Sequence, residues 1–295
     1  MTSAVTAGPR AVGAAISVAS DLGLTVERAV VLHASNRSTL RLLPADLVGR
    51  VALSSHGAMQ LEVDLAARLA GVDGPVATLD PRVPARVYQR DGFAITLWTY
   101  HEPEPSRELA PDAYANALLR LHQAMKHVDL PTPHFLDRVK QAEEIVGDRE
   151  RTRALRESDR ILLTSTFSSV TRAIGERRGV EQVLHGEPHA GNVLNTASGP
   201  LFIDLETACR GPVEFDVAHV PQDVSAGYPD IDQELLRQCR MAVLAMVAAW
   251  RLEPGDQLPN GERAAAELLA ALRAGPPYPT LDALGGGGPP STGQA

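Results

Sequence analysis

Apolar and polar positions alternate in three short segments near the start of the chain. Residues 28–35, 38–44 and 47–53 are rich in strand-forming side chains and are bounded by Asn, Pro, Asp or Gly. Residues 86–100 have the pattern of a hairpin that turns at Asp91-Gly92. Together these segments predict a small antiparallel sheet.

Helical spacing of apolar residues marks most of the remaining elements. Residues 56–71 have one apolar face and end at Gly71, which is typical of a helix followed by a turn. Short strand-like pieces at 180–186, 192–197 and 200–206 interrupt the helical second half. The other helices are expected at 11–19, 111–127, 135–145, 155–178, 232–251 and 260–274.

The change from strands to helices predicts an α+β fold of two domains. We expect an N-terminal domain over residues 1–100 and a helical domain over 101–274, joined by a Pro-rich hinge at 101–106. The ends, 1–9 and 275–295, are rich in Gly, Pro and Ser and are predicted to be disordered. Ligands bind preferentially where two domains meet, so a cleft at this junction is the expected place for function.

The composition and net charge indicate which kinds of ligand or partner the protein is suited to bind. The 295 residues are 44% apolar, which is enough to build such cores. A net charge of −8 argues against nucleic acid as a partner and suits a cationic ligand better, although it also serves solubility. Cys209 and Cys239 form no disulfide framework, so a reducing cytoplasm is the simplest location. The most apolar run, 241–250, is too short to span a bilayer, and no membrane association is expected.

Two polar clusters follow apolar runs in the second half of the chain. In 183–194, "VLHGEPHAGNVL", Glu187 precedes Asn192 by five residues, the spacing by which a catalytic loop places a base and a metal-binding amide on one side of a turn. In "FIDLE", Asp204 ends an apolar strand that would carry its carboxylate to a cleft. Phosphoryl transfer requires such parts: Mg²⁺ held by a carboxylate and an amide oxygen, and a carboxylate beside the attacking hydroxyl.

Both clusters resemble motifs of the aminoglycoside phosphotransferase family, a group of protein-kinase-like small-molecule kinases. The resemblance implies a bilobal protein-kinase-like fold, with a small antiparallel-sheet N-terminal lobe and a larger, mainly helical C-terminal lobe. It also implies ATP or GTP and Mg²⁺ as cofactors and a hydroxyl of a small molecule as acceptor. The family's His-Gly-Asp-x-His-x-x-Asn motif is matched by His185, Gly186, His189 and Asn192, and its metal motif by Asp204, Gly211, Pro212 and Asp216.

The same resemblance assigns roles in the second half of the chain. Glu187 stands at the position of the catalytic base, and Asn192 and Asp204 stand at those of the metal ligands. His185 and His189 are expected to support the loop, with one ring packed beneath it and hydrogen-bonded to backbone or to Asp216.

Nucleotide-binding roles fall in the first half. Arg50 occupies the position of the strand Lys or Arg that contacts phosphates, and Glu62 that of its ion-pair partner on the following helix. Ser35 and Asn36 lie in the turn over the phosphates. The linker that hydrogen-bonds adenine would be residues 96–100, with Trp98 and Tyr100 as candidate contacts.

Two residues depart from the family pattern. Glu187 replaces Asp and is longer by one methylene, about 1.5 Å. A misplacement of about 1 Å can reduce a rate roughly a hundredfold, yet a loop that retracts absorbs this length, and we favour an active enzyme. Arg50 stands where many relatives have Lys; its planar fork suits phosphate oxygens and leaves the choice of ATP or GTP open.

Structural interpretations stay open for several of these residues. Asp204 can cap a turn at a strand end, and Arg50 with Glu62 can be a surface ion pair. Ser35 and Asn36 can form a plain turn, and Trp98 can pack in the core. The acidic stretch 223–234 can bind a cationic substrate or simply be a solvated loop that caps the next helix at Asp230 or Asp232.

Two rival functions come from other classes. A nucleotide-binding protein without catalysis would share every motif, with Glu187 as a non-productive substitute for Asp. A metal-dependent hydrolase would hold zinc with His185, His189 and Asp204, although Gly186 and Pro188 disfavour the helix that such a histidine pair requires.

Overall fold

The computed structural model describes residues 8–34, 37–54, 58–104, 109–177, 180–254, 256 and 260–284. Contacts between residues divide the chain into two compact units. Unit 1 comprises Met1–Glu108, His127–Leu130 and Leu194–Thr207, and unit 2 comprises Leu109–Lys126, Pro131–Val193 and Ala208–Ala295.

This division differs from the expected domains in several segments, since unit 1 extends to Glu108 and also includes His127–Leu130. The segment Leu194–Thr207 groups with unit 1, whereas we expected it in the helical domain. At the ends, where we expected disorder, residues 1–7 and 285–295 lie outside the described part of the chain, while a helix begins at Pro9 and Asp282–Leu284 forms a 3₁₀ turn.

Unit 1 is built on a five-stranded antiparallel sheet in the order β1-β2-β3-β5-β4. The predicted hairpin between β4 and β5 is present, and Asp91 and Gly92 in its turn have φ values of 52° and 82°, as a type I′ turn requires. The strands are β1 (Val26–Ala34), β2 (Ser38–Pro44), β3 (Leu47–Leu53), β4 (Tyr88–Arg90) and β5 (Phe93–Thr99).

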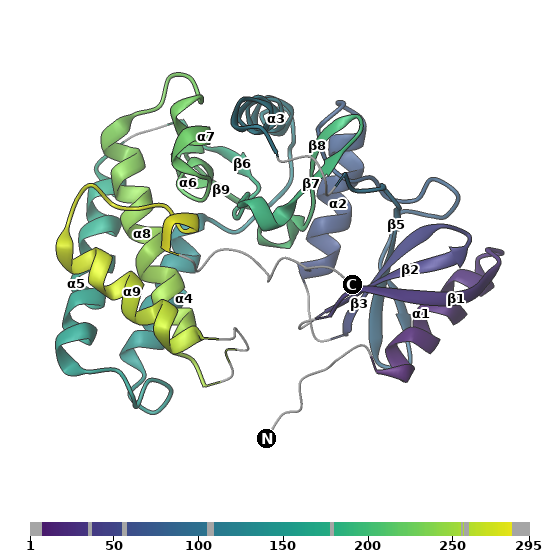
Figure 1. Ribbon diagram of the computed structural model, residues 1–295, viewed down its shortest axis with the longest axis horizontal. Helices are drawn as coiled ribbons and strands as arrows, with labels where there is room; N and C mark the ends of the chain where they lie inside the picture. The colour runs from purple at the N-terminus through teal and green to yellow at the C-terminus, as the bar shows by residue number, and fades with distance from the viewer. Residues whose placement is uncertain are drawn as a thin grey trace. The chain divides into compact units, whose positions relative to one another are not determined.

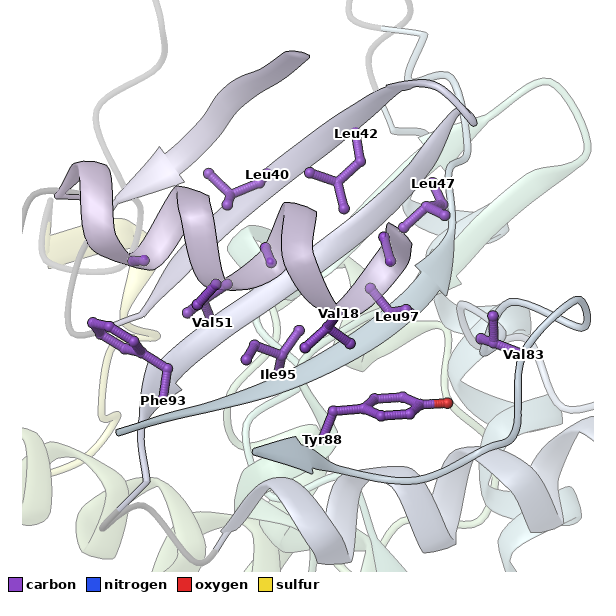
Figure 2. Close-up of a cluster of buried hydrophobic side chains, with 14 residues drawn as sticks. Val18, Leu40, Leu42, Leu47, Val51, Val83, Tyr88, Phe93, Ile95 and Leu97 are labelled. Atoms are coloured by element: carbon purple, nitrogen blue, oxygen red, sulfur yellow. The ribbon is translucent and has the colours of Figure 1, made fainter. Parts of the chain in front are cut away.

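The first helix covers one face of this sheet. Helix α1 (Pro9–Asp21) lies across the strands, and the side chain of Val18 faces a layer of buried apolar residues (Figure 2). Alternate residues of β2 and β3 are buried, which is the period-two pattern read from the sequence. The layer includes Leu40, Leu42, Leu47, Val51, Ile95 and Leu97.

A second helix and a small hairpin complete unit 1. Helix α2 (Ala58–Ala70) follows β3, and strands β7 (Val193–Thr196) and β8 (Gly199–Phe202) form a two-stranded sheet. Phe202 exchanges backbone hydrogen bonds with residues 75–77: its N–H donates to Pro75 O at 2.8 Å, and Ala77 N–H donates to Phe202 O at 2.9 Å. These bonds tie the end of β8 to residues 75–77 within unit 1.

Unit 2 is mainly helical. Helix α8 (Gln233–Arg251) is buried along most of its length and packs against α4, α5 and α9 (Figure 1). Its N-cap is Asp232, whose carboxylate accepts from Glu234 N–H at 2.9 Å and Leu235 N–H at 3.0 Å, which confirms the capping interpretation. The other helices are α3 (Pro111–Met125), α4 (Phe135–Gly147), α5 (Glu157–Gly175), α6 (Val213–Val217), α7 (Gln222–Ala226) and α9 (Gly261–Ala274).

Two short strands flank the polar segments of unit 2. Strand β6 (Gln182–Leu184) pairs antiparallel with β9 (Cys209–Gly211). The α+β organisation and the long helices predicted from the sequence are confirmed, whereas α6, α7 and β9 were not predicted. Within the described residues, no helix combines the length and the apolar character needed to cross a membrane.

Candidate active site

The loop after β6 is anchored by a buried carboxylate. Asp216, in α6, has no solvent exposure, and its Oδ2 and Oδ1 accept the backbone N–H groups of His185 at 2.9 Å and Gly186 at 2.8 Å. Burial raises the pKa of Asp216, but the hydrogen bond from His122 Nε2, at 3.0 Å, outweighs it and lowers the pKa. His122 in turn contacts Tyr228 Oη through Nδ1 at 2.6 Å.

Glu187 follows this anchor directly. Gly186 has a φ of 91°, a left-handed conformation that a side chain would strain. The Glu187 carboxylate forms an ion pair with Arg138 and is 24% exposed. Burial raises the pKa of Glu187, but the charge of Arg138 and then that of His219 outweigh it, so the pKa lies below its usual value and the side chain is a carboxylate anion at neutral pH.

Asn192 lies on the same loop as Glu187. It ends the 3₁₀ turn Ala190–Asn192, and its Nδ2 donates to the backbone oxygen of Glu187 at 2.9 Å. That bond commits the amide nitrogen, so the Oδ1 atom is the group available to a cation. Glu187 and Asn192 are therefore joined directly by a hydrogen bond within one loop.

Both histidines of the motif brace the backbone. His185 is fully buried, and its Nδ1 accepts from Glu187 N–H at 3.3 Å. His189 caps the next turn, with Nδ1 accepting from Gly191 N–H at 3.1 Å. Across the part of the chain that the structure describes, no group of three or more His, Cys, Asp or Glu side chains is placed to hold a metal ion.

A charged cluster in unit 1 gathers several of the predicted nucleotide and metal residues. Arg50 forms an ion pair with Glu62, and the two side chains are only 13% and 1% exposed. The surface ion-pair interpretation is therefore wrong, because Glu62 is fully buried and Arg50 is only slightly exposed. Arg50 Nη2 also lies 3.1 Å from Asp204 Oδ1. Burial lowers the pKa of Arg50, but Glu62 and Asp204 raise it, so the guanidinium stays charged.

Arg37 adds a second cation that the sequence did not single out. Its Nη2 lies 2.6 Å from Asp204 Oδ1 and also contacts Glu206, and the side chain is 10% exposed. Burial raises the pKa of Asp204, but Arg50 and Arg37 outweigh it and lower the pKa to about 2. Burial raises the pKa of Glu206 to about 7, with Arg37 opposing. Asp204 thus remains an anion at neutral pH.

The backbone at Asp204 is also unusual. Its φ is 67°, a left-handed conformation that few residues other than Gly, Asn and Asp adopt. Such conformations cluster at ligand-binding positions because the surrounding structure must hold them in place. Here Leu205 N–H donates to Glu62 Oε1 at 3.2 Å and fixes the residue that follows.

The other predicted nucleotide residues are less directly placed. Ser35 and Asn36 lie outside the described residues. Trp98 is 5% exposed and its Nε1 donates to Thr96 Oγ1 at 2.8 Å, which fits the core interpretation. The Arg41 guanidinium stacks over the ring of Tyr100, with its central carbon 3.6 Å from the ring centroid.

Each of the two candidate ligands, one in each unit, is of the chemical type that a divalent cation such as Mg²⁺ prefers. Mg²⁺ prefers carboxylate and carbonyl oxygens, and it is commonly bound by one or two protein groups together with phosphate oxygens. The Asp204 carboxylate is 29% exposed, and the Oδ1 of Asn192 is not used in the bond to Glu187. Arg37 and Arg50 supply positive charge next to Asp204, as a site for phosphate groups requires.

Several contributing residues were missed by sequence reasoning. Arg37 lies just after the turn 35–36 that was expected over the phosphates, and this position was a usable signal. Arg138, His122 and Tyr228 gave none, because each acts through a contact with a residue far away in the chain.

Comparison with known proteins identifies the class. The model of the phosphotransferase enzyme family matches residues 28–251. The chain therefore belongs to the phosphotransferase enzyme family, and the resemblance read from the two motifs is confirmed. A search of curated proteins gave no match.

Solved structures share the fold at low sequence identity. The GDP complex of aminoglycoside 2′-phosphotransferase-IIIa is 17% identical with a TM-score of 0.65, covering 89% of this chain and 97% of that one. Amicoumacin kinase, solved with AMP-PNP and Ca²⁺, is 10% identical with a TM-score of 0.65, covering 88% and 93%. Spectinomycin phosphotransferase, solved with ADP and spectinomycin, is 13% identical with a TM-score of 0.59, covering 91% and 96%. The expected kinase-like α+β fold is thereby confirmed.

Proposed function

We propose that this protein is a small-molecule kinase that uses ATP or GTP with Mg²⁺ to phosphorylate a hydroxyl group. The observation that carries the proposal is the charged cluster of Arg50, Glu62 and Asp204, in a chain that also holds Glu187 and Asn192 on one braced loop. These are the parts that phosphoryl transfer requires: fixed cations, metal ligands and a carboxylate for the acceptor.

Each residue has a separate task in the proposed reaction. Asn192 Oδ1 and the Asp204 carboxylate would bind Mg²⁺, which when bound neutralises phosphate oxygens. Arg50, held by Glu62, would contact the phosphates of the nucleotide. Glu187 would orient the acceptor hydroxyl and accept its proton as the oxygen attacks phosphorus.

The low pKa of Glu187 is compatible with this task. A carboxylate with a lowered pKa is a weaker base, but the loose transition state of phosphoryl transfer places little demand on base strength. Positioning of the hydroxyl and electrostatic stabilisation supply most of the rate. The ion pair with Arg138 therefore does not argue against catalysis.

The acceptor is proposed only as a class. Related structures contain kanamycin in one case and spectinomycin in another, and nucleotides that include GDP, ADP and AMP-PNP. An amino sugar is thus one candidate, together with other small alcohols. A cytoplasmic location is part of the proposal and is supported by Cys209 and Cys239, which are both free, buried thiols.

A nucleotide-consumption screen tests the proposal. Purified protein would be incubated with Mg-ATP or Mg-GTP and a panel of aminoglycosides and simpler alcohols, beside the Glu187→Gln and Asp204→Asn variants. Turnover of one acceptor by the wild type and its loss in both variants would support the assignment. Lys140→Gln, an exposed change on α4, is the control that should retain wild-type turnover.

The rival without catalysis predicts a different result. Nucleotide binding measured by calorimetry would then be present, but no acceptor would increase consumption and the three proteins would show the same background. A stable protein that binds no nucleotide would contradict both possibilities.

A further inference from the structure

We propose that Arg138 is a positioning residue that adapts this active site to a glutamate base. The inference rests on the proposed function and goes beyond it, since no motif assigns a role to this helix. Arg138 lies on α4, and its guanidinium contacts two consecutive residues of the catalytic loop, Gly186 and Glu187.

The guanidinium is fixed at three points. Nη2 donates to the carboxylate of Glu187, and Nη1 donates to the backbone oxygen of Gly186 at 3.1 Å. The carbon at its centre lies 5.1 Å from the ring centroid of Trp250, at the end of α8. With 14% exposure, the side chain has little access to solvent, so these contacts are weakly screened. The planar guanidinium has several N–H donors in fixed directions and can make these contacts at the same time, which the ammonium group of a lysine cannot do.

The helix that carries Arg138 is itself well anchored. His134 caps α4 in a capping box with Asp137, so the start of the helix is fixed. Phe135 is fully buried, with its ring centroid 4.8 Å from that of Phe215. Helices α4 and α8 pack directly against each other (Figure 1). Arg138 therefore extends from a rigid frame, which is what a group that orients a catalytic side chain requires.

The chemistry explains why a glutamate needs such a partner. Glu has one more rotatable bond than Asp, so its carboxylate reaches farther and has more orientations to choose from. By holding one oxygen, Oε1, Arg138 selects a single orientation and leaves Oε2 to face the acceptor hydroxyl. The same guanidinium also donates to Gly186 O and so fixes the position of the loop backbone next to Glu187. Arg138 itself transfers no proton and forms no bond to the substrate.

Steady-state kinetics of Arg138→Gln tests this role. We expect kcat to fall roughly ten- to a hundredfold, because the carboxylate is no longer aimed. The KM for the nucleotide should change by less than about twofold, since Glu187 contacts the acceptor and not the nucleotide. Arg138→Lys should be intermediate, because it keeps the charge and loses the fork. Lys140→Gln removes a positive charge from the exposed face of the same helix and should match the wild type.

A double-mutant cycle separates positioning from general damage. In the Glu187→Gln background, Arg138→Gln should reduce kcat no further, since the group on which it acts has been removed. A multiplicative effect of the two changes, or a wild-type kcat for Arg138→Gln, would overturn the proposal. If Arg138→Gln does not fold, Arg138→Lys carries the same comparison, and melting temperatures of every variant identify this case.

Failure of the proposed function has a different signature. The free energies of unfolding of the wild type, the two single variants and the double variant give the coupling energy between Arg138 and Glu187 without any substrate. Coupling in stability together with a wild type that turns over no acceptor would reject the kinase assignment, and the positioning role with it. Absence of coupling in an active enzyme would reject the positioning role alone.

Discussion

Asp216 accepts the backbone N–H of His185 at 2.9 Å, although 31 positions separate the two residues in the chain. The carboxylate also accepts from Gly186 and from His122, so both of its oxygens are occupied in an environment without solvent. One buried charge therefore determines the path of the loop that carries Glu187 and Asn192.

Replacing Asp216 by Asn should destabilise the protein by roughly 2–5 kcal/mol. The change removes the charge and directs an amide N–H at groups that are themselves donors, leaving buried polar groups unsatisfied. Urea unfolding followed by circular dichroism measures the loss. Glu144→Gln, on the exposed part of α4, is the matched control and should lie within about 0.5 kcal/mol of the wild type.

Asp204→Asn should reduce turnover on the order of a hundredfold while preserving the fold. Asn tolerates the left-handed φ of 67° but lacks the charge that a divalent cation and two arginines require. Titration of Mg-nucleotide by calorimetry should show weaker binding. Asp91→Asn provides the control, because it makes the same exchange at a hairpin turn with φ 52°. Unchanged Mg-nucleotide affinity in Asp204→Asn would remove the metal assignment.

Glu187→Asp should lower kcat about tenfold, although it restores the residue typical of the family. The Arg138 contact is made to the longer side chain, and shortening it by about 1.5 Å breaks the ion pair or withdraws the carboxylate from the acceptor. Initial rates at saturating nucleotide give the comparison. An Asp variant faster than the wild type would mean that the loop, rather than Arg138, accommodates the glutamate.

Stability should fall as the pH is lowered from about 6.5 to about 4, in part because of His219. Burial lowers the pKa of His219 to about 4 in the folded protein, against an ordinary value near 6.5. The unfolded chain therefore binds a proton in this interval that the folded protein does not, and unfolding is favoured by up to about 3 kcal/mol. Urea unfolding at pH 7, 5.5 and 4.5 should show a steeper decline for the wild type than for His219→Gln. Replacing the exposed Gln123, which has no titratable group, by Ala should leave the slope unchanged.

The regular elements could be predicted from the sequence because their signals are local. Alternation in β2 and β3, the Asp91-Gly92 turn and the apolar face of α2 each lie within one element and need no distant partner. Helices α6 and α7 were missed because five residues are too few to show a helical period.

The same reasoning explains which parts of the candidate site were found. Glu187 and Asn192 are five residues apart, so their shared turn is visible in the sequence, and the family resemblance drew attention to Asp204 and Asp216. Arg138 has no such signal: it resembles any polar residue on an amphipathic helix until its contact 49 positions away is known. Long, flexible side chains that act across the chain are identified by three-dimensional packing alone.

The inclusion of Leu194–Thr207 in unit 1 restricts how this protein can be divided. A fragment that stops before residue 105 keeps Arg50 and Glu62 but lacks Phe202, whose backbone bonds secure residues 75–77, and lacks Asp204 as well. The N-terminal half is thus not a transferable nucleotide-binding module. Chimeras between relatives should exchange residues 194–207 together with the N-terminal sheet. Arg37, Arg50 and the Asp204 carboxylate that they contact then come from the same protein.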